Sequence, residues 1–431
     1  MPDRPLSRRT FLAGTTTAAA GAALAPGLAA LASQAKPILK VGLVGCGGRG
    51  TGAAYNALLA EDGTVALTAM GDVFADRLDA ALAHLVVSLG EAKADRVQVD
   101  EAHRFVGFDA YRKVIESDVD VVLLATPPGF RPEHLRAAVD AGKHVFTEKP
   151  VAVDAPGVRS VLESVRKAKV RGLALVSGFC WRYKSGHRAA FERLRSGGIG
   201  ELHAFYSTYL ASPLGTHPRR PGWTDMEWQL RNWQHFLWLG GDHVVEQAVH
   251  SIDKQSWAFG DEPPLACVAV GGRQARTGPE SGDIYDHFSV TYDYADGRRA
   301  FHVCRQMPSC AFDNSDFAYG TKGRLTINGW GPLYLIEGEQ PWEYDGEHND
   351  MYQQEHDELF ASLRAGAPKN DGDFMATSTM LAIMGRMAAY TGRVISWEEA
   401  LASEQRLGPA EWAFGDLAVG EVAVPGTTRF F

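Results

Sequence analysis

Short, uniformly apolar runs alternate with amphipathic segments over the first part of the chain. The apolar runs, which predict buried strands, are residues 40–45, 65–70, 119–125, 144–147 and 173–177. Segments with helical periodicity follow them after short connections. Strands that are apolar on both sides are typical of a parallel sheet covered by helices on both faces. The pattern predicts the α/β class, with a doubly wound parallel sheet at the N-terminal end.

The periodicity changes after about residue 200. Runs with strand-like alternation lie at residues 202–210, 266–271, 286–294, 300–306 and 324–327. Asp296-Gly297 is a typical hairpin turn between two of them. These runs predict a large, mainly antiparallel sheet in a second α+β domain. We expect a first domain at 36–152 and a second at 153–431, whose helix at about 373–391 packs back on the first.

A glycine motif joins the first apolar run to the first helical segment. Gly45, Gly47 and Gly50 have the spacing Gly-x-Gly-x-x-Gly, with Gly48 and Arg49 between them. The first glycine permits a tight turn, the second a close approach to a diphosphate, and the third close packing of helix and strand. The helix N-terminus then offers unpaired N–H groups to phosphates. We expect a Rossmann domain that binds a dinucleotide cofactor.

Asp72 ends the second apolar run, where an acidic residue contacts the ribose in such domains. Its carboxylate can accept hydrogen bonds from the ribose hydroxyls of NAD and would repel the 2′-phosphate of NADP. The prediction is therefore NAD in preference to NADP.

The N-terminal residues predict export. Residues 7–12, Ser-Arg-Arg-Thr-Phe-Leu, have the twin-arginine signature, and a weakly apolar Ala/Gly/Thr stretch follows. An unstructured basic tail is the alternative. We expect residues 1–35 to be a signal peptide with a short linker. The twin-arginine machinery would then carry a folded, cofactor-loaded protein to the periplasm or beyond the cell.

Composition excludes some functions and leaves others open. The net charge of −9 gives no indication of a nucleic-acid partner, and no apolar run after the signal is long enough to span a bilayer. Five cysteines are few for a disulfide framework. Cys304 and Cys310 could pair in an oxidising compartment or remain free thiols.

Two further motifs follow predicted strands of the parallel sheet. Thr126-Pro127 follows one strand, and Glu148-Lys149-Pro150 follows the next. Ligands bind beyond the carboxyl ends of such strands, so we expect both motifs at the cofactor site. A lysine there can donate to a substrate hydroxyl or take part in proton transfer. The alternative for Lys149 is a solvated surface lysine.

Residues 240–253 hold the other candidate catalytic group. On one helix, Asp242, Glu246 and His250 would share a face, with Asp253 near His250. A carboxylate one turn away can fix the tautomer of His250 and raise its basicity, which suits a general base. A satisfied structural histidine is the plainer interpretation. Zinc held by His243, Glu246 and His250 is a weaker alternative, and we expect no metal.

Aromatic residues suggest a carbohydrate site, because aromatic faces stack on the C–H surfaces of sugars. The candidate substrate residues are Trp181, Arg182, Tyr183, Trp223 and the nearby carboxylate Asp253, together with Trp228, Arg231 and Trp233. Core packing is the alternative, and it is the better explanation for several of them.

Taken together, these motifs resemble the Gfo/Idh/MocA oxidoreductase family. The matching residues are 45–50, Thr126-Pro127, 141–150 (Ala-Gly-Lys-His-Val-Phe-Thr-Glu-Lys-Pro) and 240–253. The resemblance implies that Lys149 and His250 act on a substrate hydroxyl next to a bound nicotinamide nucleotide. It also implies a homodimer or homotetramer, and for exported members a tightly held nucleotide.

The sequence departs from the family at two positions. Glu246 stands where the family usually has Asp, and Arg131 stands where it often has His, with His134 one turn further on. We expect hydride transfer between a sugar, cyclitol or glycoside hydroxyl and the nucleotide. Redox-neutral cleavage of glycosides is the alternative. A binding protein without catalysis is disfavoured because Lys149, Glu246 and His250 are all present.

Overall fold

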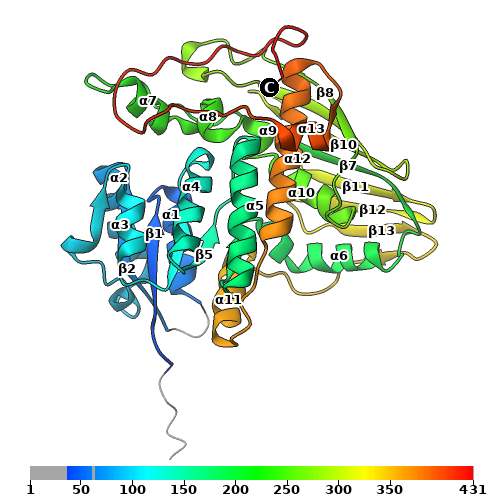
Figure 1. Ribbon diagram of the computed structural model, residues 1–431. Helices are drawn as coiled ribbons and strands as arrows, with labels where there is room; N and C mark the ends of the chain where they lie inside the picture. Colours follow the sequence, from blue (N-terminus) through cyan, green and yellow to red (C-terminus); the bar gives the residue numbers. More distant parts are fainter. Residues whose placement is uncertain (1–35, 61–63, 431) are drawn as a thin grey trace, which may run out of the picture. The chain divides into compact units, whose positions relative to one another are not determined.

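The first sheet has six parallel strands in the order β3-β2-β1-β4-β5-β6. The computed structural model describes residues 36–60 and 64–430 (Figure 1). The strands are β1 (Leu39–Val44), β2 (Val65–Asp72), β3 (Arg104–Val106), β4 (Val121–Leu124), β5 (His144–Thr147) and β6 (Leu175–Ser177). The predicted doubly wound sheet is confirmed. It continues past the expected boundary at residue 152, because β6 pairs with β5. The twin-arginine motif lies outside the described residues.

Helices cover both faces of this sheet. Apolar residues of α1 (Gly48–Leu58) and α2 (Ala75–Leu89) form a core with one face. Those of α3 (Ala110–Glu116), α4 (Arg131–Asp140) and α5 (Ala155–Val170) pack on the other. Asp154 caps α5 by accepting a hydrogen bond from the Gly157 N–H at 2.8 Å.

The second sheet has nine strands in the order β14-β13-β12-β11-β7-β10-β9-β8-β15. They are β7 (Leu202–Ala211), β8 (Ala266–Gly272), β9 (His287–Asp293), β10 (Arg299–Gln306), β11 (Ser315–Gly320), β12 (Gly323–Asn328), β13 (Tyr334–Gly338), β14 (Trp342–Glu343) and β15 (Ile395–Ser396). Among the described strands of this second sheet, only β7 and β10 pair in parallel, so the mainly antiparallel sheet is confirmed. The hairpin turn at Asp296-Gly297 lies between β9 and β10 as expected.

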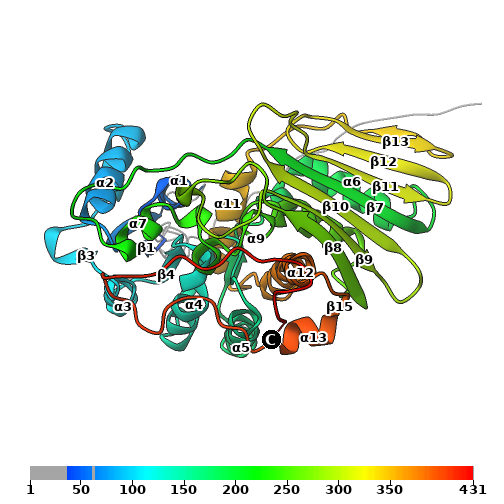
Figure 2. The ribbon, with the colours of Figure 1, turned by 90° about the horizontal axis from the view of Figure 1, so that it is seen from above.

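Three helices cover one face of the second sheet: α6 (Ser185–Arg195), α10 (Val249–Ala258) and α12 (Gly372–Thr391) (Figures 1 and 2). Helix α12 contacts α5 of the Rossmann domain, and β8 and α10 of the second domain, so it packs against both domains. The Tyr292 hydroxyl donates to the carbonyl of Leu381 on α12 at 2.8 Å. The apolar side chains at 288, 290 and 292 therefore face the helices.

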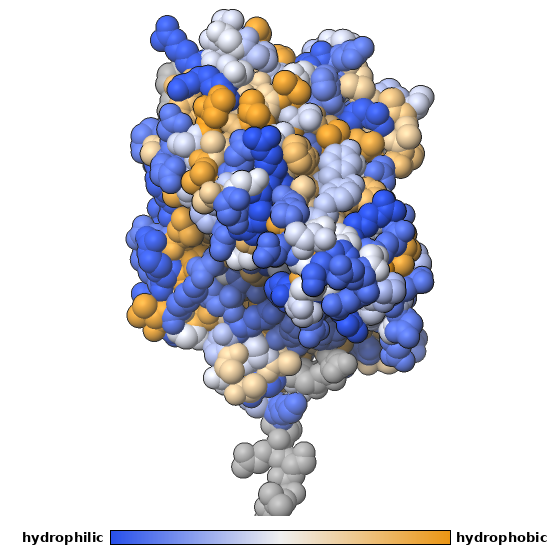
Figure 3. Space-filling model, turned by 90° about the vertical axis from the view of Figure 1, so that its right-hand side faces the viewer, coloured by the Kyte–Doolittle hydropathy of each residue, from blue (hydrophilic) through white to orange (hydrophobic). Residues whose placement is uncertain are grey.

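The other face of this sheet carries partly exposed apolar side chains. Val268 and Val270 on β8 and Tyr319 on β11 are 43%, 69% and 43% exposed. Figure 3 views the side of the molecule on which the sheet lies, and hydrophobic residues form separate groups among hydrophilic ones there.

The single helix predicted for residues 242–253 is broken into two helices, α9 (His243–Glu246) and α10. Residues 225–258 form α7 (Asp225–Arg231), α8 (Leu237–Gly240), α9 and α10. At the break, the Ala248 N–H donates to the carbonyl of His243 at 2.9 Å, one residue further back than in a regular α-helix. The expected common face for Asp242, Glu246 and His250 is wrong.

Asp242 caps α9 from a left-handed conformation with φ of 77°. Its buried carboxylate accepts hydrogen bonds from the Tyr285 N–H at 2.8 Å and the Tyr390 hydroxyl at 2.5 Å. It is a structural group that joins α9 to the segment before β9 and to α12.

After α11 (Met351–Arg364), α12 and α13 (Trp397–Ala402), residues 403–430 contain no further helix or strand. This C-terminal segment, drawn red, runs from α13 past α7 and back (Figures 1 and 2). In the described part of the chain, no helix has the length and apolar character needed to cross a membrane. All five cysteines are free thiols.

Candidate active site and nucleotide cleft

A cavity of about 310 Å³ lies at the carboxyl ends of the parallel strands. Seven predicted cofactor residues line it: Gly45, Gly47, Gly48, Arg49, Asp72, Thr126 and Pro127. A larger space of about 990 Å³ adjoins it and shares Gly47, Gly48 and Arg77. The structure therefore brings the glycine motif, the acidic residue and Thr126-Pro127 to one cleft.

The glycine positions fit a dinucleotide. A Cβ atom at Gly47 or Gly48 would meet nothing within 4 Å, so the loop faces open space there. Gly45 has φ of 95°, and a Cβ at Gly50 would lie 1.8 Å from the Gly45 carbonyl oxygen. The first and last glycines are thus required by backbone geometry, and the middle ones leave room for a diphosphate at the start of α1.

The Asp72 carboxylate accepts hydrogen bonds from backbone N–H groups and also lines the cleft. One carboxylate oxygen accepts the Cys46 N–H at 2.7 Å and the other accepts the Phe74 N–H at 2.9 Å. Burial raises the pKa of Asp72 from its usual value, although both hydrogen bonds oppose the shift. Asp72 thereby fixes the glycine loop, and Arg77 lies close enough for its charge to act on Asp72.

Buried charges connect the glycine loop to the next motif. The Arg49 Nε donates to Glu148 Oε1 at 2.9 Å, and the Arg49 Nη2 lies 3.8 Å from Glu355 Oε1 on α11. Burial opposes ionisation of Glu148, but Arg49, Lys149 and Arg131 together lower its pKa. Burial, followed by the charge of Glu148, raises the pKa of Glu355 well above its usual value. Glu355 gave no recognisable signal in the sequence.

Lys149, Glu246 and His250 come together beside the cleft. The Lys149 ammonium donates to the backbone carbonyl of Glu246 at 2.6 Å and lies 3.8 Å from its carboxylate. Glu246 Oε2 and His250 Nδ1 are buried and have no hydrogen-bond partner among the described residues. Burial, then the charges of Lys149, Lys254 and Arg49, lower the pKa of His250 well below its usual value. The expected rise in the basicity of His250 is therefore not found, and the shift favours the neutral imidazole, the form that can accept a proton.

Three predicted substrate residues lie elsewhere. Arg182 forms a buried ion pair with Asp253 at 2.8 Å, and Asp253 also accepts the Ser378 hydroxyl at 2.8 Å. Asp253 lies three residues after His250 on α10, but its carboxylate is committed to Arg182 and Ser378. The Tyr183 hydroxyl donates to Asp371 in the core.

Trp223 lines the 990 Å³ space on the nucleotide side, with Arg231 stacked on its ring at 4.9 Å. Its predicted place in the sugar site is therefore not supported, since Lys149 and His250 line neither that space nor the smaller cavity.

Trp181 is the predicted aromatic that does adjoin the catalytic group. Its ring centroid lies 5.3 Å from that of His250. Trp330, from the loop after β12, packs edge-on against Trp181 at 5.7 Å and against Tyr209 at 6.0 Å. Sequence reasoning did not identify Trp330 or Tyr209, because neither belongs to a recognisable motif.

The C-terminal segment packs against aromatic rings that line the nucleotide cleft. Phe414 packs on Phe74 at 6.0 Å and on Phe108 at 5.0 Å, and both of these rings line the cavity. Trp412 packs on Phe130, also in the lining, at 4.6 Å and on Trp238 of α8 at 5.8 Å. Residues 412–414 thus join the Rossmann half to the helical segment that holds α7 and α8.

Together, the fold and the cleft define a two-domain protein whose first half is a Rossmann domain with a cavity at the glycine motif. Residues 39–176 match the family model for Gfo/Idh/MocA oxidoreductases with an NAD-binding Rossmann fold. Residues 187–326 match the Gfo/Idh/MocA C-terminal domain. The two matches cover more than half of the chain, and it belongs to this family.

Several characterised proteins are similar to this chain. One is the 2,7-anhydro-N-acetylneuraminate hydratase of Escherichia coli, 27% identical over 42% of this chain and 44% of its own length. Another is the inositol 2-dehydrogenase of Rhizobium meliloti, 24% identical over 51% of this chain and 60% of its own length. The matched region thus spans about half the length of these relatives.

Solved structures share the fold. An aldose–aldose oxidoreductase from Caulobacter crescentus has a TM-score of 0.66 at 20% identity, covering 83% of this chain and 99% of its own. A levoglucosan dehydrogenase, solved with NADH and levoglucosan, has a TM-score of 0.65 at 17% identity over 83% and 99% of the two chains. At such identities the likeness supports the fold alone.

Proposed function

We propose that this protein transfers hydride between a hydroxyl-bearing carbon of a carbohydrate-like substrate and a tightly bound NAD. The observation that carries the proposal is the arrangement of Lys149, Glu246 and His250 beside the nucleotide cleft. Two buried polar atoms there, Glu246 Oε2 and His250 Nδ1, have no partner in the described chain. Unpaired buried polar atoms are costly, so these two call for a partner such as a bound ligand or a water.

Each side chain has a defined task in this reaction. The neutral His250 accepts the proton of the substrate hydroxyl. The Lys149 ammonium, held by the Glu246 carbonyl at 2.6 Å, donates to the same oxygen and stabilises its developing negative charge. Glu246 balances the charge of Lys149. Bound NAD would supply the hydride acceptor.

Two features support tight binding of NAD. Trp412 and Phe414 of the C-terminal segment buttress Phe130 and Phe74, two rings that line the cleft. Asp72 places a carboxylate where a 2′-phosphate would be unfavourable. The test is to denature the purified protein and identify the nucleotide released, and then to screen sugars and cyclitols for reduction of the bound nucleotide. An apo protein that needs added NAD would contradict tight binding.

A second candidate is redox-neutral cleavage or hydration of a glycoside. In this case oxidation at one carbon acidifies its neighbour, elimination follows, and the hydride returns to the substrate. The enclosed cleft and the likeness to a protein named as a hydratase favour its inclusion. Product formation from a glycoside without accumulation of reduced nucleotide would distinguish it from net oxidation.

Export and self-association complete the proposal. Residues 7–12 direct the folded protein through the twin-arginine machinery to the periplasm or beyond. The open face of the nine-stranded sheet, with Val268, Val270 and Tyr319, forms the contact of a homodimer or homotetramer. Replacing Arg8 and Arg9 by Lys should leave the protein in the cytoplasm. Light scattering at micromolar concentration should exclude a monomer.

A further inference from the structure

Trp330 is an exposed indole close to the catalytic group. It lies in the loop between β12 and β13 and is 61% exposed. Its edges contact Trp181 and Tyr209, which are both buried. Trp181 in turn adjoins His250. These three rings, the aromatic wall, therefore lead from the catalytic imidazole to solvent.

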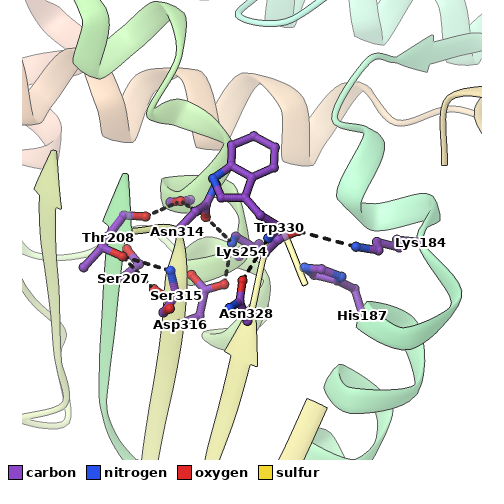
Figure 4. Close-up of polar contacts among 12 residues, drawn as sticks. Lys184, His187, Ser207, Thr208, Lys254, Asn314, Ser315, Asp316, Asn328 and Trp330 are labelled. Atoms are coloured by element: carbon purple, nitrogen blue, oxygen red, sulfur yellow. Dashed lines mark hydrogen bonds and ion pairs between the residues drawn. The ribbon is translucent and has the colours of Figure 1, made fainter. Parts of the chain in front are cut away.

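The loop that carries Trp330 is held in place by hydrogen bonds. Asn328 Oδ1 accepts the N–H groups of Trp330 at 3.1 Å and Gly331 at 3.0 Å. The Gly329 N–H donates to the Asn314 carbonyl at 2.6 Å, and Lys184 donates to the Gly329 carbonyl at 3.4 Å. In Figure 4 the indole stands above these polar groups, on the side away from the strands. A ring fixed in this way can stack on a ligand without a large loss of side-chain entropy.

A buried cation supports the inner end of the aromatic wall. The Lys254 ammonium lies 3.8 Å from the Trp181 ring centroid, forms an ion pair with Asp316, and donates to Asn314 Oδ1 at 3.2 Å (Figure 4). Lys254 and Asp316 are 0% and 1% exposed. A buried pair of this kind contributes little net stability, but it restricts where Trp181 can lie.

Polar atoms with unmet hydrogen bonds lie at the same end. Trp181 Nε1 is buried without a partner in the described residues, as are Glu246 Oε2 and His250 Nδ1. One indole donor, one carboxylate acceptor and one imidazole suit a ring that carries several hydroxyl groups. The outer end offers only the face and edge of Trp330, which suits an apolar ring surface.

We propose that the substrate has two rings, and that Trp330 stacks on the ring that is not oxidised. The substrate class is then a glycoside, either a disaccharide or an aryl glycoside, instead of a free monosaccharide. This inference rests on the proposed function. The oxidised ring lies against Trp181, Lys149 and His250, and the second ring extends along the aromatic wall toward solvent.

The test compares a disaccharide with its constituent monosaccharide, both chosen from the sugar screen for reducing the bound nucleotide. Trp330→Ala should lower kcat/KM for the disaccharide about tenfold or more, mainly through KM, with about twofold change or less for the monosaccharide. Trp330→Phe should recover most of the loss. Titration calorimetry should show the same weakening in disaccharide affinity. Trp342→Ala, at the far edge of the same sheet, is the matched control and should change kcat/KM for neither saccharide.

Two outcomes would overturn the inference. Equal effects of Trp330→Ala on both saccharides, or no effect on either, would show that Trp330 does not select a second ring. In that case the proposed oxidoreductase function would still stand. If no saccharide reduced or consumed the bound nucleotide, the proposed function would fail, and this inference with it.

Discussion

The Lys149 ammonium is bound by the backbone carbonyl of Glu246, at 2.6 Å, and lies 3.8 Å from the carboxylate of the same residue. A substitution at 246 therefore leaves the hydrogen bond to Lys149 in place and removes only the neighbouring charge. We expect Glu246→Gln to lower turnover by about tenfold, clearly less than removal of Lys149. Steady-state kinetics with equal nucleotide content checks this. A loss as large as that of Lys149→Ala would assign Glu246 a direct part in proton transfer.

Lys149 and His250 should behave as one unit. Lys149→Ala and His250→Ala are each expected to lower turnover by roughly 10²–10⁴, because both act on one substrate oxygen. The double variant should lose far less than the product of the two. Lys167→Ala, an exposed lysine on α5, is the control. Strictly multiplicative losses would place the two residues in separate steps.

Asp72 should favour NAD over NADP. Asp72→Ala removes the carboxylate from the cleft and also its two hydrogen bonds to the Cys46 and Phe74 N–H groups. We expect weaker NAD binding and a relaxed preference, measured by competition between the two nucleotides. Asp72→Asn, which keeps an acceptor oxygen, should relax the preference with a smaller loss of NAD affinity. Tighter binding of NADP by the unmodified protein would refute the prediction and point to Arg77.

His134 should make stability depend on pH. Its ring is stacked on Tyr111, with centroids 4.0 Å apart, and burial lowers its pKa from 6.5 to about 3. Below pH 6.5, the pKa of an unperturbed histidine, the unfolded chain binds a proton at His134 that the native chain does not. His134 therefore makes the free energy of unfolding decrease as the pH falls. His134→Gln removes this effect. The difference in free energy of unfolding between the unmodified protein and this variant should shrink by about 1.4 kcal/mol for each pH unit that the pH is lowered below ~6. Urea unfolding at several pH values measures this, and a constant difference would contradict a neutral His134.

The C-terminal segment should control release of the nucleotide. Replacing Trp412 and Phe414 by Ala removes the ring contacts with Phe130, Phe74 and Phe108. We expect nucleotide dissociation to accelerate roughly tenfold or more, since affinity changes appear mainly in off-rates. Nucleotide retained through gel filtration, and a chase experiment, would measure it. Val419→Ala in the same segment is the control. Unchanged retention would locate the barrier elsewhere in the cleft.

Local sequence predicted the groups whose place depends on a strand end. Gly45, Asp72, Thr126 and Lys149 each follow a buried parallel strand, and the sheet brings such ends together whatever the rest of the chain does. This explains why the first sheet and the cofactor cleft could be predicted.

Groups that depend on long-range partners were not predictable in this way. Periodicity placed Asp242 and Asp253 beside His250, but Asp242 is bound by Tyr285 and Tyr390, and Asp253 by Arg182 and Ser378. A carboxylate goes to its strongest donors, and those donors come from distant elements. The break between α9 and α10 likewise has no local signal such as Pro.

The C-terminal segment also sets an order of events during synthesis. The glycine loop leaves the ribosome early, and the sheet around it can form while most of the chain is still unmade. The wall that Trp412 and Phe414 add arrives only when translation has nearly ended. If these rings hold the nucleotide as proposed, a nascent or truncated chain would have a Rossmann half that exchanges it freely. Firm capture of the cofactor would then mark a finished polypeptide and distinguish complete molecules from incomplete ones.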